Sequence, residues 1–196
     1  MAVSELLVWV DCEMTGLDLA RDELVEVAVL VTDAQLQILG EGVDVVIKPS
    51  TAAIDQMDEF VRNMHSSSGL ITALDAGLPM RVAEERVLEY VRQFVPEPRK
   101  APLAGNTIHT DRAFLARDMP EFEGYLHYRN VDVSSVKELV RRWYPKVRQD
   151  RPQKQGLHRA LDDIRDSIDE LRYYRERVFV PTGTDAGAVS PAPSER

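Results

Sequence analysis

Two acidic residues, Asp11 and Glu13, lie two positions apart directly after the apolar run 6–10. Side chains alternate between the two faces of a strand, so residues i and i+2 point the same way. Unpaired carboxylates at the edge of a core are costly, and a hard divalent cation is their usual partner. If the apolar run is a buried strand, the pair can bind a metal ion. The alternative is a strand that ends in solvent, where the two acids have no special role.

Three further residues can contribute to the same chemistry. Asp111 follows a short strand and lies at the start of a helix, and strand ends with the helices after them are where α/β proteins assemble their sites. In the last predicted helix, Asp163 lies at the border of the apolar stripe, whereas Asp162 points nearly the opposite way. His158 precedes that helix, so its ring can reach the same site. The alternative is that these acids only favour helix N-termini through the helix dipole.

The elements that must position these residues are predicted from hydrophobic periodicity. Strands are predicted at 6–10, 24–31, 42–47, 103–105 and 130–133. Long helices are predicted at 82–95 and 159–178, and two short helices in 55–77, the second capped by Ser67 or Ser68. Two more helices are predicted, one capped by Thr110 and one capped by Ser134 or Ser135. In this last helix, Val136, Leu139, Val140 and Trp143 form one stripe and predict a packed face, and 146–156 predicts a polar surface loop. The order predicts an α/β fold with a mixed sheet, an antiparallel meander plus parallel strands, and helices on both faces.

Bulk properties limit the class of protein. The 196 residues can form one buried domain, which we expect to span 1–180, with a disordered tail at 181–196 rich in Gly, Ala, Ser, Pro and Thr. The formal net charge of -9 argues against a protein that grips long nucleic acid through many phosphates. The single cysteine, Cys12, fits a reducing compartment, and the first apolar run is too short for a membrane span. We therefore expect a cytoplasmic protein with no membrane partner.

Motifs spread over the chain resemble a known superfamily. Asp11-x-Glu13, Asn106-x4-Asp111 and His158-x4-Asp163 resemble the three motifs of the DEDDh 3′-to-5′ exonucleases. Within that superfamily, the strings 11–17, 127–129, 132–135, 137–139, 158–165 and 173–175 resemble the oligoribonuclease family, and the similarity covers about residues 4–180. The resemblance implies a ribonuclease H-like fold, a homodimer, and release of 5′-mononucleotides from the 3′ end of very short RNAs, including dinucleotides such as pGpG.

The resemblance also implies a mechanism. Two Mg²⁺ or Mn²⁺ ions would be held by Asp11, Glu13, Asp111 and Asp163, with Asp11 bridging both ions, and His158 would be the general base. Six residues would contact the substrate: Leu17 and Phe60 beside the bases, His65, Arg129 and Ser134 at phosphate, and Tyr128 reaching across from a partner subunit. Against this, Phe60 and Tyr128 are equally typical of core aromatics, and Arg129 of a surface cation.

The sequence is also compatible with other functions. A haloacid-dehalogenase-type phosphatase would need Asp-x-Asp and a later lysine, whereas this chain has Asp11-x-Glu13 and His158. A non-catalytic module that only senses a dinucleotide would not need all five catalytic positions. An exonuclease for longer tRNA ends or for DNA proofreading is the nearest alternative enzyme. His109 is bulky where the family is small, and it predicts either a surface residue or one that crowds the site.

Overall fold

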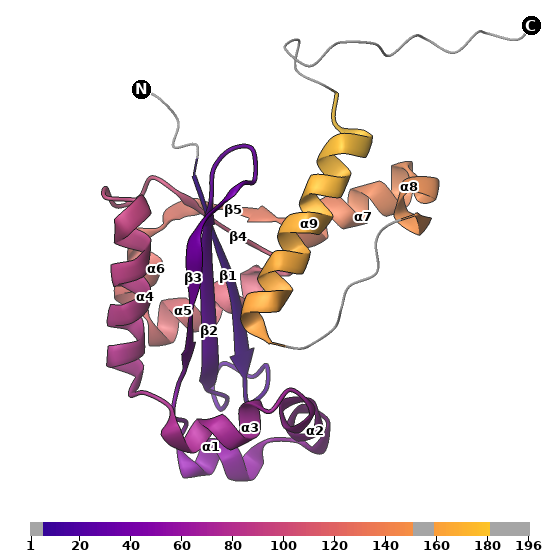
Figure 1. Ribbon diagram of the computed structural model, residues 1–196. Helices are drawn as coiled ribbons and strands as arrows, with labels where there is room; N and C mark the ends of the chain where they lie inside the picture. The colour runs from indigo at the N-terminus through magenta and orange to yellow at the C-terminus, as the bar shows by residue number, and fades with distance from the viewer. Residues whose placement is uncertain (1–5, 151–158, 181–196) are drawn as a thin grey trace, which may run out of the picture.

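The computed structural model describes residues 6–150 and 159–180, and its centre is a five-stranded mixed sheet (Figure 1). The strand order is β3-β2-β1-β4-β5. The bounds are Leu7–Met14 for β1, Leu24–Thr32 for β2, Ile38–Val46 for β3, Pro102–Gly105 for β4 and His127–Asp132 for β5. Strands β1, β2 and β3 form an antiparallel meander, and β1, β4 and β5 are parallel. The predicted mixed sheet is confirmed.

Strand β1 lies at the centre of the sheet and divides the core into two halves. Its even residues, such as Val8 and Cys12, pack in one hydrophobic cluster, and Trp9 packs in the other. The alternation follows from the pleat of a strand. Asp11 and Glu13 are odd residues and therefore share the face of Trp9. The acids thus lie inside the strand, which continues to Met14, rather than after its end.

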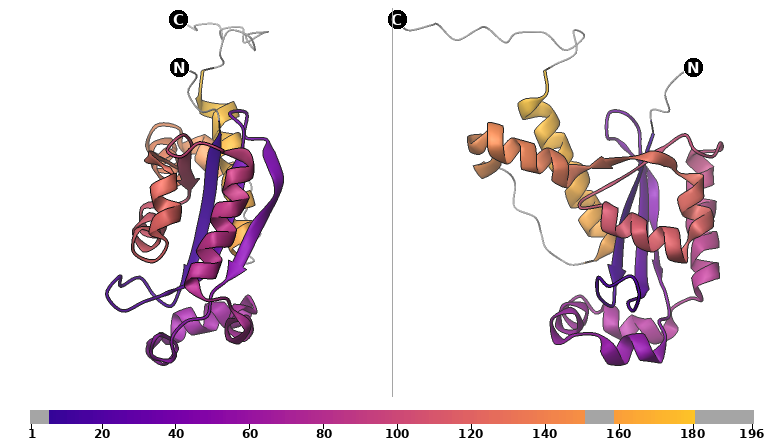
Figure 2. Two further views of the ribbon diagram at one scale, coloured as in Figure 1. Left: turned by 90° about the vertical axis from the view of Figure 1, so that its left-hand side faces the viewer. Right: turned by 180° about the vertical axis from the view of Figure 1, so that it is seen from behind.

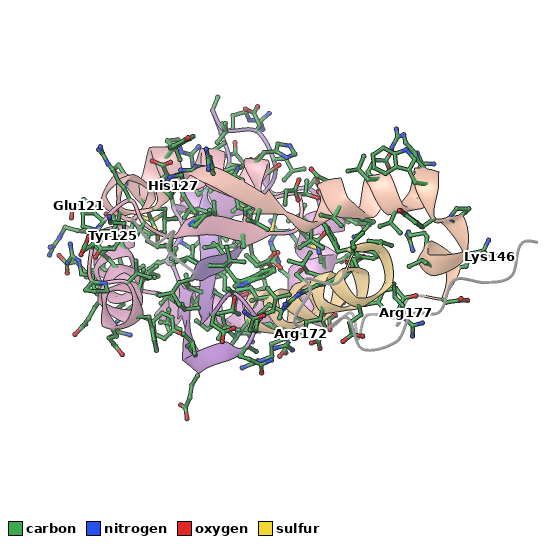
Figure 3. The ribbon with its side chains drawn as sticks, turned by 90° about the horizontal axis from the view of Figure 1, so that it is seen from above. Glu121, Tyr125, His127, Lys146, Arg172 and Arg177 are labelled. Carbon is green, nitrogen blue, oxygen red and sulfur yellow. The ribbon has the colours of Figure 1, made fainter. Side chains whose placement is uncertain are left out.

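Helices cover both faces of this sheet, as predicted. Helices α4 (Met80–Phe94), α5 (His109–Asp118) and α6 (Pro120–Tyr125) pack on one face, and α7 (Val133–Trp143) and α9 (Ala160–Val178) on the other. Seen from above, side chains fill the space between the sheet and these helices, while the labelled Arg172 and Arg177 lie along α9 (Figure 3). Among the described residues, we find no helix that is both long and apolar enough to cross a membrane.

Short helices gather at the end of the meander (Figure 2). They are α1 (Thr51–Gln56), α2 (Glu59–Ser67), α3 (Leu70–Ala73) and a 3₁₀ turn at Leu74–Ala76. The prediction of two helices in 55–77 was therefore wrong in number. The predicted cap at Ser67 or Ser68 was also wrong, because Gly69 at φ 79° precedes α3 and the Ser67 hydroxyl donates back to the carbonyl of Asn63.

Two other predicted caps were wrong. Helix α5 begins at His109, so Thr110 lies inside its first turn and does not cap it. Helix α7 is capped by Asp132, whose carboxylate accepts hydrogen bonds from the backbone N–H of Ser134 at 3.0 Å and from the Ser135 hydroxyl at 3.0 Å. Asp132, two positions before Ser134, satisfies the free N–H groups that a serine cap would have served.

The region after α7 also differs from its prediction. Pro145–Gln149 forms a short helix, α8, which overlaps the start of the range 146–156 expected to be a loop, because proline is well suited to the first position of a helix. The remainder of that range, 151–156, lies outside the described residues. On α7, only Val140 of the predicted packed stripe is fully buried, and Leu139 and Trp143 are 43% and 66% exposed. Val136 packs against the core beside Val140, so within the described part of the chain Leu139 and Trp143 are the members of the stripe left exposed.

Candidate active site

Three carboxylates converge between β1 and α9. Strand β1 supplies Asp11 and Glu13 from one face, and the first turn of α9 supplies Asp163. One carboxylate oxygen from each residue lies within 4.8 Å of the other two. Asp162, the next acid on α9, instead pairs with Arg165 at 3.0 Å and is 47% exposed. The helical wheel thus identified the acid of α9 that meets the strand.

The start of α9 is attached to the sheet by an ion pair with a buried partner. Glu26 of β2 is fully buried, and its Oε1 accepts hydrogen bonds from Nε and Nη2 of Arg159 at 3.0 and 2.8 Å. Its Oε2 lies 3.4 Å from the backbone nitrogen of Ala160, and Arg159 also reaches Asp44 at 3.3 Å. The carbonyl of Arg159 accepts the backbone N–H of Asp163 at 3.0 Å. The ion pair therefore fixes the turn that presents Asp163.

Asp111 reaches β1 from α5, on the other side of the strand from α9. Strand β4 pairs with β1 only at Val8 and Trp9, so the edge of β1 beyond this point is free for other partners. There Oδ1 of Asp111 accepts the backbone N–H of Cys12 at 2.9 Å. Burial raises the pKa of Asp111 to about 6. Asp111 thus lies beside the residue between the two strand acids, but it is not part of the three-carboxylate group.

The electrostatics of the group fit a hard cation. Glu13 faces Glu26 directly across the β1–β2 ladder, and like charges in such a pair repel. Burial, followed by the charges of Glu26, Asp163 and Asp111, raises the pKa of Glu13 to about 8. All the donors are carboxylate oxygens, the type that Mg²⁺ and Mn²⁺ prefer. The residues present therefore fit a divalent metal, which would relieve the repulsion between them.

The raised pKa of Glu13 predicts how stability depends on pH without metal. The folded protein holds this proton more tightly than the unfolded chain does, so the associated stability is complete below pH 4.5 and is lost as the pH rises through about 8. In EDTA, the free energy of unfolding from urea titrations should therefore fall between pH 5.5 and pH 8.5. The Glu13→Gln variant, which cannot ionise there, should show a shallower fall. Equal slopes for the two proteins would contradict the assignment.

His65 lies next to Glu13 and is fully buried. Its Nε2 lies 2.8 Å from the carbonyl oxygen of Met14, so Nε2 carries the hydrogen when the ring is neutral. Its Nδ1 lies 3.9 Å from Oε2 of Glu13 and is, among the described residues, the buried side-chain atom that lacks a hydrogen-bond partner. Burial lowers the pKa of His65, so this contact is not an ion pair at neutral pH. The phosphate-binding role of His65 stays a prediction.

Three large apolar side chains of the predicted substrate site are exposed. Leu17, Phe60 and Tyr128 are 76%, 78% and 74% exposed. The alternative that Phe60 and Tyr128 are core aromatics was therefore wrong. Arg129 is exposed as well, and its guanidinium carbon lies 5.5 Å from the centre of the Tyr128 ring. Exposed apolar surface is typical of binding sites and subunit contacts.

Ser134, His109 and His158 complete the set of residues considered from the sequence. The Ser134 hydroxyl donates to Asp132 at 2.6 Å and accepts the backbone N–H of Thr107 at 3.2 Å, so it joins the ends of β4 and β5. His109 is exposed on α5, which agrees with a surface residue rather than one that crowds the site. His158, the predicted general base, lies outside the described residues.

Glu26 and Arg159 were not predicted from the sequence as part of the site. A signal was present for Glu26, because a charge in the middle of the valine-rich strand 24–32 needs a buried partner. Arg159 follows the predicted base directly, but nothing in the sequence indicates that its partner lies 133 residues away.

Comparison with known proteins agrees with this geometry. The model of the RNase_T exonuclease family matches residues 8–171, which include the three carboxylates and Asp111. This chain belongs to the exonuclease family. The match covers β2 to β5 completely and β1 from Val8 onward.

Within the family, the chain is similar to proteins named oligoribonuclease. It is 63% identical to that of Cutibacterium acnes over 177 residues, which covers 90% of this chain and 88% of the relative. It is 64% identical to that of Streptomyces griseus over 179 residues, covering 91% and 89%. It is 55% identical to that of Mycobacterium avium over 194 residues, covering 96% and 90%. The similarity therefore extends over nearly the whole length of both partners.

Solved structures of more distant exonucleases show the same fold. A zinc-bound exonuclease I–single-stranded DNA complex from E. coli superposes with a TM-score of 0.69 at 14% identity, over 88% of this chain and 41% of that one. Exonuclease I of Methylocaldum szegediense gives a TM-score of 0.62 at 23% identity, again over 88% and 41%. The chain thus spans about two fifths of these larger proteins, and the likeness concerns the fold alone.

Proposed function

We propose that this protein is a 3′-to-5′ exoribonuclease that hydrolyses RNAs of two to a few nucleotides to 5′-mononucleotides. The observation that carries the proposal is the convergence of Asp11, Glu13 and Asp163 within 4.8 Å, in a chain that is 63% identical to a named oligoribonuclease. We take residues 1–180 as one catalytic domain. The reducing compartment indicated by the single free Cys12 supports a cytoplasmic location.

The acidic residues would hold the cations. Asp11, Glu13 and Asp163, together with Asp111, would hold two Mg²⁺ or Mn²⁺ ions. Two such ions would neutralise the scissile phosphate and lower the pKa of the attacking water. The carboxylates offset the charge of the ions, which explains how a protein with a net charge of -9 can accept an anionic substrate.

His158 would complete the chemistry as the general base. It takes the proton from the water as its oxygen attacks phosphorus, the bond from phosphorus to O3′ breaks, and the released O3′ takes up a proton. The product is a nucleoside 5′-monophosphate. His158 directly precedes Arg159, which the ion pair with Glu26 fixes against the sheet.

The substrate length would be set by contacts at both ends of a short RNA. Leu17 and Phe60 offer apolar surface to the bases, and His65, Arg129 and Ser134, with Tyr128 of a second subunit, would hold the 5′ phosphate. Only a short substrate can touch both groups at once, so a longer RNA loses contacts at one end. Binding energy that depends on both ends favours the dinucleotide.

This proposal predicts the turnover of pGpG. With Mn²⁺, the protein should cleave pGpG with a kcat/KM at least tenfold higher than that for a 5′-phosphorylated ten-mer, and EDTA should stop both reactions. Product chromatography measures each rate. Equal values for the two lengths would reject the two-ended contact and favour an enzyme for longer RNA. Binding of pGpG without turnover would indicate a sensing module.

The proposed dimer is supported by the exposed members of the α7 stripe. Leu139 and Trp143 are 43% and 66% exposed, and Tyr128 of β5 is 74% exposed. Large apolar and aromatic side chains of this kind are enriched at subunit interfaces. Sedimentation velocity should give twice the chain mass of 22.2 kDa, and the Trp143→Glu variant should shift toward the single-chain mass. A wild-type protein that sediments as a single chain at micromolar concentration would contradict the dimer.

A further inference from the structure

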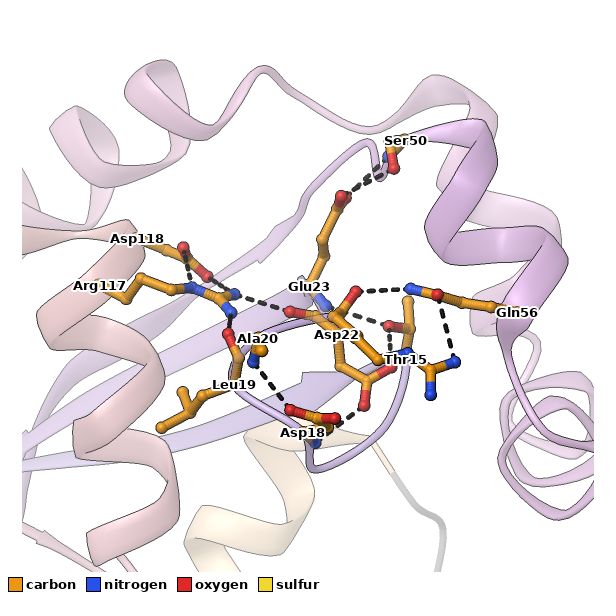
Figure 4. A network of polar contacts seen from close by, with 11 residues as sticks. Thr15, Asp18, Leu19, Ala20, Asp22, Glu23, Ser50, Gln56, Arg117 and Asp118 are labelled. Atoms are coloured by element: carbon orange, nitrogen blue, oxygen red, sulfur yellow. Dashed lines mark hydrogen bonds and ion pairs between the residues drawn. The ribbon is translucent and has the colours of Figure 1, made fainter.

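The segment that joins β1 to β2, residues 15–23, holds Leu17 away from the protein body. We call this segment the Leu17 turn. Leu17 is 76% exposed, whereas Thr15 at the start of the turn is 1% exposed. Holding an exposed leucine in one position costs conformational entropy unless the backbone that carries it is already fixed. Figure 4 shows that polar contacts fix this backbone from inside and from outside.

The inner contacts centre on the carboxylate of Asp22. Its Oδ1 accepts the Thr15 hydroxyl at 3.0 Å, and its Oδ2 accepts the backbone N–H of Asp18 at 2.9 Å. The two partners flank Leu17 on either side along the chain. A Cβ atom on Gly16 would lie 2.3 Å from Oδ2 of Asp22, so only glycine allows the carboxylate to fill the turn. The Asp22 carboxylate thus fills the inside of the Leu17 turn and holds its backbone through hydrogen bonds.

The outer contacts come from Arg117 at the end of α5. Its guanidinium donates to the carbonyl of Leu19 and, at 2.8 Å, to the carbonyl of Asp22. The same group binds both carboxylate oxygens of Asp118 and lies 4.9 Å above the ring of Phe114. The planar, rigid guanidinium is therefore fixed by contacts within α5 as well as by its hydrogen bonds to the turn. Helix α5 also carries Asp111, so one helix contacts both the backbone of β1 at Cys12 and the Leu17 turn.

We propose that Asp22 and Arg117 are positioning residues that fix Leu17 against a nucleobase of the substrate and so determine the affinity for short RNA. The proposal rests on the proposed function and deepens it. Neither residue touches the reacting phosphate. Their loss should weaken binding without slowing the chemical step, because the three-carboxylate group stays intact.

The first experiment measures KM and kcat for pGpG with the Arg117→Ala variant. We expect KM to rise about tenfold with kcat within about twofold of the wild type. Hydrolysis of bis(p-nitrophenyl) phosphate, which has no nucleobase, should be unchanged. The Arg117→Lys variant, which keeps the charge but not the two-armed donor, should give an intermediate KM. A kcat loss on both substrates would overturn the proposal, because it would mean that the variant disturbs α5 and Asp111.

A double-mutant cycle separates positioning from general structure. If Arg117 acts through Leu17, the Leu17→Ala, Arg117→Ala double variant should have the KM of Leu17→Ala alone, within about twofold. A merely structural effect would multiply the two KM increases, and that result would overturn the proposal. Arg81→Ala is the matched control, because it also removes one arginine and its ion pair with Glu85, on an exposed surface of α4. Its KM should equal that of the wild type.

Hydrogen–deuterium exchange tests the same contacts without any substrate. In Arg117→Ala and in Asp22→Asn, the amides of the Leu17 turn should exchange at least tenfold faster, while those of β1 are unchanged. Unchanged exchange in the turn would overturn the proposal even if the enzyme were active. If the wild type hydrolysed no short RNA but the exchange behaved as expected, the proposed function would fail and the contacts that fix the turn would stand.

Discussion

Asp11→Asn should lower the rate of pGpG hydrolysis at saturating Mn²⁺ by about 1,000-fold or more, a loss of about 4 kcal/mol in transition-state stabilisation. Asp11 is one of only two acids that β1 contributes to the three-carboxylate group, together with Glu13. The amide has the same shape but no charge, so it binds a divalent ion poorly. The rate should be measured under single-turnover conditions, which separate chemistry from product release.

A second signature of this variant is thermal. A ligand present at 100 times its dissociation constant stabilises the folded state by about 2.7 kcal/mol, which raises the melting temperature of a chain of this size by about 5–10 °C. The wild type should gain this amount with Mn²⁺, and Asp11→Asn should gain much less. In EDTA the variant should melt at or above the wild-type temperature, because one repelling charge has been removed.

The control for Asp11→Asn is Asp162→Asn. Asp162 is adjacent to Asp163 on α9, but it is 47% exposed and pairs with Arg165. Its replacement also removes one negative charge from the protein, and it should leave the rate within about twofold of the wild type. Residual activity of Asp11→Asn above a tenth of the wild type, or an equal loss in Asp162→Asn, would show that the three-carboxylate group is not the catalytic centre.

Of the variants proposed, Arg159→Ala should lower the free energy of unfolding the most. Removing one partner of a buried ion pair typically costs about 3–5 kcal/mol, because the remaining charge stays buried without compensation. Glu26 is fully buried and Arg159 is 37% exposed, so we expect a loss near 3 kcal/mol in the free energy of unfolding. Chemical denaturation followed by circular dichroism measures it. The start of α9 would lose its attachment, and pGpG turnover should fall with it.

Two variants test the cause of this loss. Glu26→Gln in the Arg159→Ala background should recover part of the stability, because the uncompensated charge is gone. Arg165→Ala breaks an exposed pair on the same helix and should cost less than about 1 kcal/mol. The destabilisation by Arg159→Ala should also be greater at pH 8 than at pH 6, since burial already raises the pKa of Glu26. No recovery in the double variant would disprove the role of the ion pair.

The buried strands and the strand acids could be predicted because both follow local rules. The valine-rich run 24–32 is buried along its whole length, and its composition alone indicates a central strand. The spacing of Asp11 and Glu13 follows from the two-residue period of a strand, and the choice of Asp163 over Asp162 follows from the turn of a helix. These signals need no knowledge of distant contacts.

The remaining features depend on contacts far along the chain or on exposed edges. Strand β3 begins at Ile38, four residues before its prediction, because an edge strand with mostly exposed side chains lacks a hydrophobic pattern. Glu26 and Arg159 meet across 133 residues, and Arg117 meets Leu19 across 98. The exposed face of α7 has the periodicity of a packed helix, and sequence cannot tell a core partner from a second subunit.

The alternation of β1 has a consequence for how faithfully the chain must fold. Shifting this strand by one residue against β2 would turn Asp11 and Glu13 toward the apolar side that Val8 and Cys12 now occupy. Two carboxylates would then be buried without a cation or counter-charge, which is energetically costly. We therefore expect the residues proposed for catalysis also to favour the native register of β1 over a slipped pairing.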